Sequence, residues 1–306
     1  ACAIPAIMAT RNIESWKERL ITILVTPFTT CSARLPVYLI IIELVIPEGR
    51  FLGLGYQPLT LMLLYLIGFG TAVLSAWVLN KILKIKSKTF FVVEMPNYKL
   101  PLLKNVALTV LEKTKSFVFG AGKIILAISI ILWFLASYGP GNDFNNAEEI
   151  VTVKYASQNL SQQELQQKIA SYKLEHSFIG ITGRAIEPSI KPLGYDWKIG
   201  IAIVSSFAAR EVFVGTLATI YSVENEDVDT ITNRMAKDTN RITGGKLFTL
   251  ASGISLLLFY AFAMQCMSTL AIVKRETNSW KWPVLQLVIM TAFAYIVALI
   301  AFQVFK

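Results

Sequence analysis

The sequence has few charged residues and almost no histidine. Asp, Glu, Lys and Arg make up only 16% of its 306 residues, and His176 is the single histidine. A soluble domain usually carries about 25% charged residues, whereas 54% of this chain is apolar. The scarcity of charge therefore excludes an ordinary soluble protein, and we interpret the chain as an all-α, polytopic membrane protein in a lipid bilayer.

Cysteine is also scarce, and several common kinds of site are missing. The three cysteines are too few, and odd in number, to suggest a disulfide framework. The net charge of +9 lies in short loops between apolar runs, as in a membrane protein, and no module that reads nucleic acid is recognisable. No phosphate-binding loop with the Walker spacing is present either, so we expect no nucleotide site and no enzymatic activity in this chain.

One stretch near the start of the chain returns near its end. Residues 2–17 (CAIPAIMATRNIESWK) and 266–281 (CMSTLAIVKRETNSWK) share a Cys, an Arg nine positions on, and a terminal Ser-Trp-Lys. Because Cys and Trp are rare in this sequence, chance is a poor explanation, and we interpret the match as an internal repeat. Only the second copy follows a long apolar stretch, so we expect the C-terminal part of a longer protein.

Six apolar stretches are long enough to cross a bilayer. We predict membrane segments at about residues 20–46, 59–80, 117–138, 198–222, 247–273 and 282–305. The first contains Pro27 and Pro36 with polar residues between them, which predicts a broken helix facing a protein cavity.

These segments divide the chain into four parts. Residues 1–19 end the first repeat, 20–116 hold two membrane segments and a basic cytoplasmic loop, 117–197 hold the third segment and an external loop, and 198–306 form the second repeat with segments four to six.

Loop charges and the number of crossings predict the orientation of the repeat. Residues 81–116 hold eight lysines against two glutamates, which predicts a cytoplasmic location. The two Ser-Trp-Lys stretches precede segments that are five crossings apart, an odd number. We therefore predict an inverted repeat that encloses a site near the midplane, as in many secondary transporters. This prediction leaves the basic residues 274–281 outside, against the usual rule, and Lys306 inside.

Ionisable residues inside the predicted segments are the first candidate site residues. Arg210 and Glu211 lie at the centre of the fourth segment, where a charge is costly and usually functional. We expect Glu211 to coordinate a cation or proton, and Arg210 to hold a half-helix or balance charge; an internal ion pair is the alternative. Ser206 lies one turn before Arg210, on the same helix face. Arg34 is expected to cap a half-helix or to meet an anionic substrate.

Sulfur-containing residues are the second group of candidates. Cys2 and Cys266 occupy matched repeat positions, and Cys31 lies in the broken first segment. Thiolates prefer soft and borderline transition metals, and Met264 and Met267 beside Cys266 are also soft ligands. The alternative is that each cysteine is an ordinary small core residue.

Several stretches resemble one known family. "ERLITILVTPFTTCSARLPVY", "SFAAREVFVGTLATIY" and "KRETNSWKWP" are similar to the membrane portion of bacterial ferrous iron transport protein B, and the resemblance covers essentially the whole chain, including its paired gate elements. The resemblance implies transport of Fe²⁺, the substrate, across the bacterial inner membrane. It also carries the functional roles of that family onto Cys2, Cys31, Cys266 and Glu211.

The same resemblance implies parts and partners beyond this chain. These are an N-terminal GTPase domain that binds GTP and Mg²⁺, and a small partner like ferrous iron transport protein A. The oligomeric state stays open, with a homo-oligomer as one alternative. Two alternatives stay open. One is a nucleoside-type or other small-solute transporter with inert cysteines, in which Arg34 and Arg210 bind oxygen-rich groups. The other is a membrane assembly or signalling module whose repeats only pack.

Overall fold

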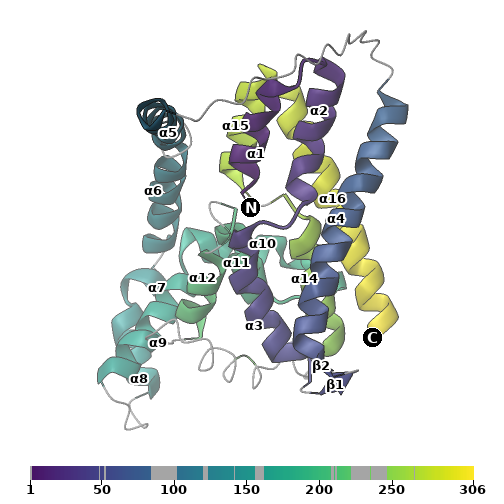
Figure 1. Ribbon diagram of the computed structural model, residues 1–306. Helices are drawn as coiled ribbons and strands as arrows, with labels where there is room; N and C mark the ends of the chain where they lie inside the picture. Colours follow the sequence, from purple (N-terminus) through teal and green to yellow (C-terminus); the bar gives the residue numbers. More distant parts are fainter. Residues whose placement is uncertain are drawn as a thin grey trace.

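The computed structural model (Figure 1) describes residues 2–47, 49–51, 53–83, 102–119, 123–140, 142–155, 162–207, 210, 212–221, 235, 247–264 and 266–306. These residues are almost entirely helical, as the apolar runs predict. The helices are α1 Ala3–Ala9, α2 Trp16–Val25, α3 Leu35–Val45, α4 Tyr56–Ile82, α5 Leu103–Phe117, α6 Lys123–Ser137, α7 Asn142–Asn145, α8 Ala147–Tyr155, α9 Gln162–Glu175, α10 Phe178–Ile190, α11 Trp197–Ser205, α12 Val212–Ile220, α14 Leu250–Phe262, α15 Met267–Thr277 and α16 Lys281–Phe305.

Short elements join some of these helices. They are the 3₁₀ turns η1 Thr10–Asn12, η2 Thr26–Phe28, η3 Ser32–Arg34 and η5 Lys191–Leu193, and a hairpin of two-residue strands, β1 Arg50–Phe51 and β2 Leu54–Gly55. Part of the predicted cytoplasmic loop is helical, because α5 lies within it; residues 84–101 of that loop are outside the described residues.

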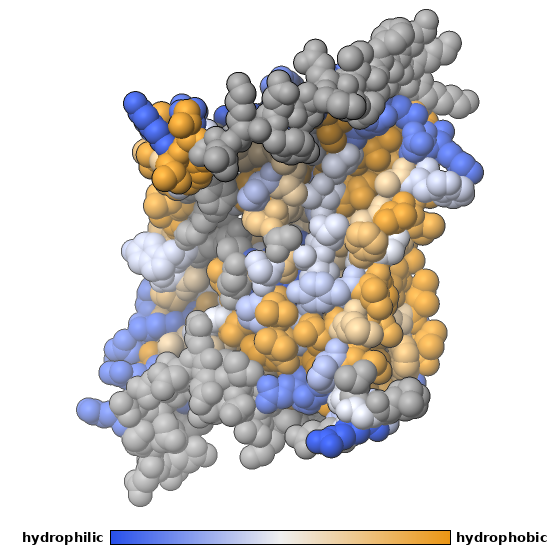
Figure 2. Space-filling view, in the orientation of Figure 1, coloured by the Kyte–Doolittle hydropathy of each residue, from blue (hydrophilic) through white to orange (hydrophobic). Residues whose placement is uncertain are grey.

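Four helical segments in the described part of the chain are long and apolar enough to cross a membrane. They are Trp16–Val45, Tyr56–Ile82, Leu250–Thr277 and Lys281–Phe305. They correspond to the predicted segments one, two, five and six, which confirms a multi-pass membrane protein. The predicted third segment corresponds to α6, which begins at Lys123 and has 15 residues. Apolar side chains cover the flank of the molecule formed by α4, and polar ones gather at its two ends (Figure 2).

The first membrane segment is broken where the prolines predict it. α2 ends at Val25, Thr29 and Cys31 are extended, and α3 begins at Leu35. Pro27 and Pro36 each lie in the first turn of a helical element, where a missing NH costs nothing because that group has no intrahelical partner. The prolines therefore start new elements on each side of an extended interruption.

The predicted fourth segment does not cross the membrane. Ser205 at the end of α11 and Thr216 in α12 are hydrogen-bonded through their hydroxyl oxygens, 2.8 Å apart. In one straight helix, eleven residues would separate them by about 16 Å. The chain therefore folds back between these helices, and α11 and α12 form a hairpin. The prediction of a continuous crossing at 198–222 is wrong, because apolar composition fits a hairpin as well as a span.

This hairpin overturns the predicted inversion of the repeat. With one crossing fewer, an even number of crossings separates the first and last segments, so both copies point the same way. α1 and α15 lie side by side with their C-terminal ends at one end of the molecule (Figure 1). Trp16 and Trp280, which directly follow these ends, therefore share that end, and α16 carries Lys306 to the opposite one.

The corrected orientation removes the conflict with the charge rule. Lys17 donates from Nζ to the Asn80 carbonyl oxygen (3.1 Å), so the C-terminal end of α4 lies at the Trp16 end. The Lys81 and Lys274 ammonium groups lie over the rings of Trp77 and Trp280, 3.7 and 4.1 Å from the ring centroids. Lysines and tryptophans thus gather at one membrane interface, the arrangement expected of a cytoplasmic face. Residues 274–281 belong to this face, and their predicted external location is wrong.

A three-residue ionic cluster joins the two repeat copies at the Trp16 end. Arg11 of η1, the turn that follows α1, donates from Nη2 to Glu276 Oε1 (2.6 Å) and from Nε to Oε2 (2.9 Å). Arg19 of α2 donates from Nη2 to Oε2 of the same carboxylate (2.8 Å). The Glu276 side chain is only 2% exposed. One buried carboxylate of α15 therefore holds α1 and α2 together.

We predict that the two repeat turns face the same side of the membrane. In a variant whose three cysteines are replaced by serine, Lys17→Cys and Lys281→Cys should react with a membrane-impermeant maleimide from one side only. Lys154→Cys, on α8 at the opposite end, should react only from the other side. Labelling of the two turns from opposite sides, compared in intact cells and inverted vesicles, would contradict the parallel arrangement.

We also predict that Glu276→Gln destabilises the fold. The substitution keeps the shape but leaves two guanidinium groups without their counter-charge, which should lower the free energy of unfolding by about 2–3 kcal/mol. This expected loss of free energy of unfolding is smaller than the loss for a fully buried ion pair, because the Arg11 side chain is half exposed. Denaturant titration in detergent micelles measures the loss. Glu149→Gln, at an exposed site in α8, is the control, and an equal effect of both substitutions would refute the role of the cluster.

Candidate functional site

The candidate site lies where two membrane helices are interrupted at the same depth. Phe293 is near the middle of α16, and its ring lies between Phe28 of the first interruption (centroids 6.2 Å apart) and Phe262 at the second (5.1 Å). Gln286 of α16 donates from Nε2 to the carbonyl oxygens of Ile23 (3.3 Å) and Leu24 (2.9 Å). α16 therefore holds both interruptions in place.

Arg34 closes the first interruption. Its side chain is 1% exposed and donates to the carbonyl oxygens of Pro27 (3.0 Å), Thr29 (3.4 Å) and Phe28 (3.5 Å). The last carbonyls of a helix have no partner within it and carry partial negative charge, which a cation satisfies. These bonds place Arg34 where a cap of a half-helix would lie, and its role in the site stays a prediction.

Arg210 closes the second interruption from the neighbouring hairpin. It is also buried, and its Nη2 donates to the carbonyl oxygen of Ala263 (3.1 Å), just beyond the end of α14. Met267 donates its backbone NH to the Phe207 carbonyl (3.2 Å), and Tyr260 donates its hydroxyl to Ser206 Oγ (3.1 Å). Arg210 thus lies at the end of α14 and Ser206 lies in the same contact, while their roles in the site stay predictions.

Each of the three cysteines directly precedes a helical element. Cys2, Cys31 and Cys266 have extended backbone angles (φ/ψ −115/135°, −99/157° and −151/101°) and stand before α1, η3 and α15. None of the three thiols accepts a capping hydrogen bond from the helical element that follows it. Cys31 and Cys266 are half-buried at the two interruptions, and Cys2 is exposed.

The two predicted methionines differ in accessibility. Met264 is 1% exposed and belongs to the main hydrophobic core, whereas Met267 is half-buried in the first turn of α15. Met267 is therefore better placed than Met264 to offer its sulfur beside Cys266.

The described residues contain only part of the predicted metal site. Among them, no group of three or more His, Cys, Asp or Glu is close enough to hold a metal ion. Glu211 lies outside the described residues, next to Arg210 in the sequence. The role of Glu211 and the shared role of the three cysteines stay predictions.

The electrostatics of the two interruptions are positive in the described part of the chain. Arg34 and Arg210 donate to carbonyl oxygens, and no described acidic group forms an ion pair with either. A metal cation that enters this region would therefore be repelled by the two guanidinium groups unless anionic ligands bind the cation there. In this sequence, the thiolates of the cysteines and the carboxylate of Glu211 are the candidate ligands that would supply this negative charge.

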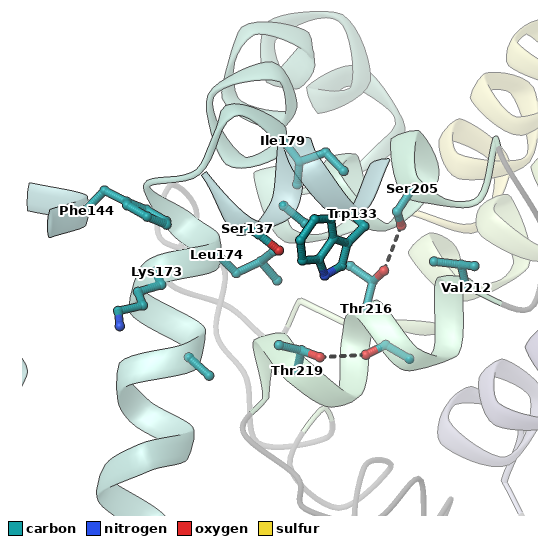
Figure 3. Close-up of a pocket in the computed structure, with 13 residues that line it drawn as sticks. Trp133, Ser137, Phe144, Lys173, Leu174, Ile179, Ser205, Val212, Thr216 and Thr219 are labelled. Carbon is teal, nitrogen blue, oxygen red and sulfur yellow. Dashed lines mark hydrogen bonds between the residues drawn. The ribbon is translucent and has the colours of Figure 1, made fainter. Parts of the chain in front are cut away.

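A separate cavity lies outside this site (Figure 3). It has a volume of about 610 Å³, and α6, α9 and α12 supply most of its lining. Several of its polar groups have partners: Ser205 is bonded to Thr216, and Lys173 to Glu148 at 2.7 Å, a bond that lowers the pKa of the Glu148 carboxyl. None of the three cysteines lines it. Its mostly apolar wall does not suit a hydrated cation.

Some site residues escaped the sequence analysis. Tyr260, Phe293 and Gln286 fix the interruptions but carry no motif. Gln286 alone gave a signal, because it is a polar side chain in the predicted sixth segment, and such residues usually bond a neighbouring helix. Gly68 of α4 lies against the first interruption, where an added Cβ would stand 3.0 Å from Thr30 Oγ1 and 3.3 Å from the Phe28 carbonyl oxygen.

Comparison with protein families gives two matches. Residues 1–44 and 118–280 match the family described as Gate: Nucleoside recognition. Residues 61–113 match the family described as Ferrous iron transport protein B C terminus. No solved structure matches the chain significantly.

Curated relatives match the chain from end to end. It is 44% identical over 308 residues to the Fe(2+) transporter FeoB of Leptospira interrogans serogroup Icterohaemorrhagiae serovar Lai, covering 100% of this chain and 42% of the relative. It is 34% identical over 318 residues to a Fe(2+) transport protein A/Fe(2+) transporter FeoB fusion protein of Porphyromonas gingivalis, covering 99% and 36%. The chain thus spans about two fifths of these relatives.

We predict that Arg34→Lys weakens the first interruption. Lysine keeps the charge but cannot reach several carbonyl oxygens with one planar fork, and each buried carbonyl left without a partner costs about 1–3 kcal/mol. Unfolding in detergent measures the loss. Arg184→Lys is the matched control, because Arg184 is 44% exposed and bonds a single glutamate, Glu175. Equal stability of the two variants would contradict the capping role.

Proposed function

Because the chain belongs to the Gate family and matches Fe(2+) transporters FeoB over its whole length, we propose that it is the permease portion of a ferrous iron importer. The observation that carries the proposal is the position of the thiols. Cys31 and Cys266 lie at two helix interruptions held at one depth by α16, where a membrane protein can expose polar groups to a path.

Fe²⁺ suits the ligands that these interruptions offer. It is a borderline cation that accepts thiolate, thioether and carboxylate ligands. Cys31, Cys266 and Glu211 would supply the negative charge that offsets Arg34 and Arg210. Cys2 stands before α1 as Cys266 stands before α15, and these two helices pack side by side.

The remaining candidates have supporting roles in this proposal. Met267 would add a soft sulfur at the edge of the path, whereas Met264 packs in the core. Arg210 and Arg34 would hold the half-helices open at the right spacing, and Ser206 would anchor Tyr260 beside them. The carboxylate of Glu211 would coordinate the ion directly.

The second candidate is a transporter for a nucleoside or another oxygen-rich solute. The description of the matching family favours it. Such a solute would need guanidinium donors that it can reach. Arg34 and Arg210 donate to backbone carbonyl oxygens, and the nitrogens that have no hydrogen-bond partner, Arg34 Nε and Arg210 Nη1, are fully buried. We therefore favour the metal ion.

The longer protein would supply the energy and the control of transport. We propose that a GTPase domain with its GTP and Mg²⁺ lies in the part of the relatives that this chain does not span, so that this chain has no enzymatic role of its own. We also propose a small partner like protein A, because one relative joins both names in one chain. The transporter would lie in the bacterial inner membrane, with the Trp16 end in the cytoplasm.

The repeat gives the proposed division of the chain. Residues 1–19 would end the first gate and 198–306 would form the second, joined by 20–116 and 117–197. The family match over residues 1–44 and 118–280 supports two gate regions, although it extends beyond these boundaries.

We predict that the thiols are needed for iron uptake. In cells that depend on the longer transporter, Cys31→Ser and Cys266→Ser should each reduce initial uptake of radioactive ferrous iron at least about tenfold, the usual scale of lost coordination. Cys31→Met and Cys266→Met keep a soft sulfur and should retain more uptake than the serine variants.

Protein level and melting temperature separate this role from a packing role. Normal iron uptake by a stable, normally expressed variant with both serine substitutions would contradict the proposed role of the cysteines as metal ligands. Uptake of a labelled nucleoside that survives in the same variant would support the second candidate.

A further inference from the structure

Helix α5 is an amphipathic helix that no other part of the described structure covers. Every described side chain of Leu103–Phe117 is exposed, including Leu103 (86%), Val106 (44%) and Val110 (57%). An apolar helix face of this kind needs a partner, because exposed large apolar side chains in a row mark an interaction surface. The proposed transport function does not use this helix.

Most apolar residues of α5 lie on one side of its axis. At 100° per residue, Leu103, Val106 and Val110 fall within about 60° of each other, and Leu111 extends this face to about 80° from Leu103. Lys104 and Lys115 follow Leu111 at about 100° and 120°, and Leu108 alone falls beyond them, at about 140°. The helix carries three lysines and one glutamate in its sequence. An apolar face bordered by lysines is typical of a helix that lies in a membrane interface.

The direction of α5 fits the same location. In Figure 1, α5 is seen end-on, whereas α6 and the membrane-length helix α4 both run from the Trp16 end toward the opposite end. α5 therefore lies across the direction of the membrane-length helices, as a helix in the membrane plane would. It also lies at the Trp16 end, with Lys17, Lys81 and Lys274. That end carries the charge and aromatic pattern of a cytoplasmic face.

We infer that α5 lies in the headgroup region of the cytoplasmic leaflet and binds anionic phospholipids there. Its apolar face would enter the boundary of the acyl chains, while Lys104 and Lys115 reach the phosphates. Anionic lipids are the occupant that fits, because lysines border the apolar face and the basic end of the molecule continues the same positive surface. A protein segment would need acidic side chains beside its own apolar face to use the same lysines.

The test compares hydrogen exchange of α5 in the longer transporter between two kinds of lipid nanodisc. One contains phosphatidylcholine alone and the other a mixture with phosphatidylglycerol. Two lysines near an anionic surface should slow exchange of the α5 amides about thirtyfold in the mixed nanodiscs. Lys104→Gln combined with Lys115→Gln should abolish this difference. The control pair, Lys154→Gln and Lys191→Gln at the opposite end, should leave it unchanged.

A second pair of variants tests the apolar face. Val106→Gln with Val110→Gln should remove the protection in both nanodiscs, whereas Asn105→Gln with Thr109→Gln, on the polar face, should keep it. Protection that is equal in the two lipids and survives loss of Lys104 and Lys115 would mean that protein covers α5. That result, or exchange at the rate of an uncovered helix in both lipids, overturns the inference.

Discussion

The arrangement of the whole molecule depends on one buried carboxylate. Glu276 accepts hydrogen bonds from Arg11 and Arg19, and both bonds are possible only if the turns after α1 and α15 meet at one end. Removing a carboxylate from water is costly, so it is stable only where cations surround it. The shared pair of arginines therefore fixes the two repeat copies as parallel neighbours. From this follow the sidedness of the basic residues and the depth of both helix interruptions.

The two helix interruptions also need partners for buried polar groups that no water reaches. Each broken helix exposes carbonyl oxygens that lipid cannot satisfy. Buried guanidinium groups donate to such oxygens at both interruptions. Arg34 belongs to the broken segment itself, whereas Arg210 comes from the hairpin beside α14. The hairpin between α11 and α12 thus has a structural reason: its turn brings Arg210 to the end of α14.

Sequence patterns predicted the elements whose physics is local. α4 and α16 follow from apolar runs of membrane length, and the first interruption follows from Pro27 and Pro36, which restrict the backbone wherever they occur. The hairpin at 198–222 could not be predicted this way, because a crossing and a re-entrant turn have the same apolar composition. The bond between Ser205 and Thr216 decides between them, and it exists only after folding. The inversion of the repeat failed for this reason alone, since it rested on a count of crossings.

The same limit applies to the candidate site. The scarcity of cysteine pointed to Cys2, Cys31 and Cys266, but only the structure shows that all three directly precede helical elements. Charge then argues for their role. Two buried guanidinium groups raise the local potential, so a cation can approach this depth only together with anionic ligands. A path that carried a neutral solute would not need such ligands. Arg34 and Arg210, which cap the half-helices, would then also affect which ligands surround an ion at this depth. Their positive charge would favour thiolates and a carboxylate over neutral oxygen ligands alone.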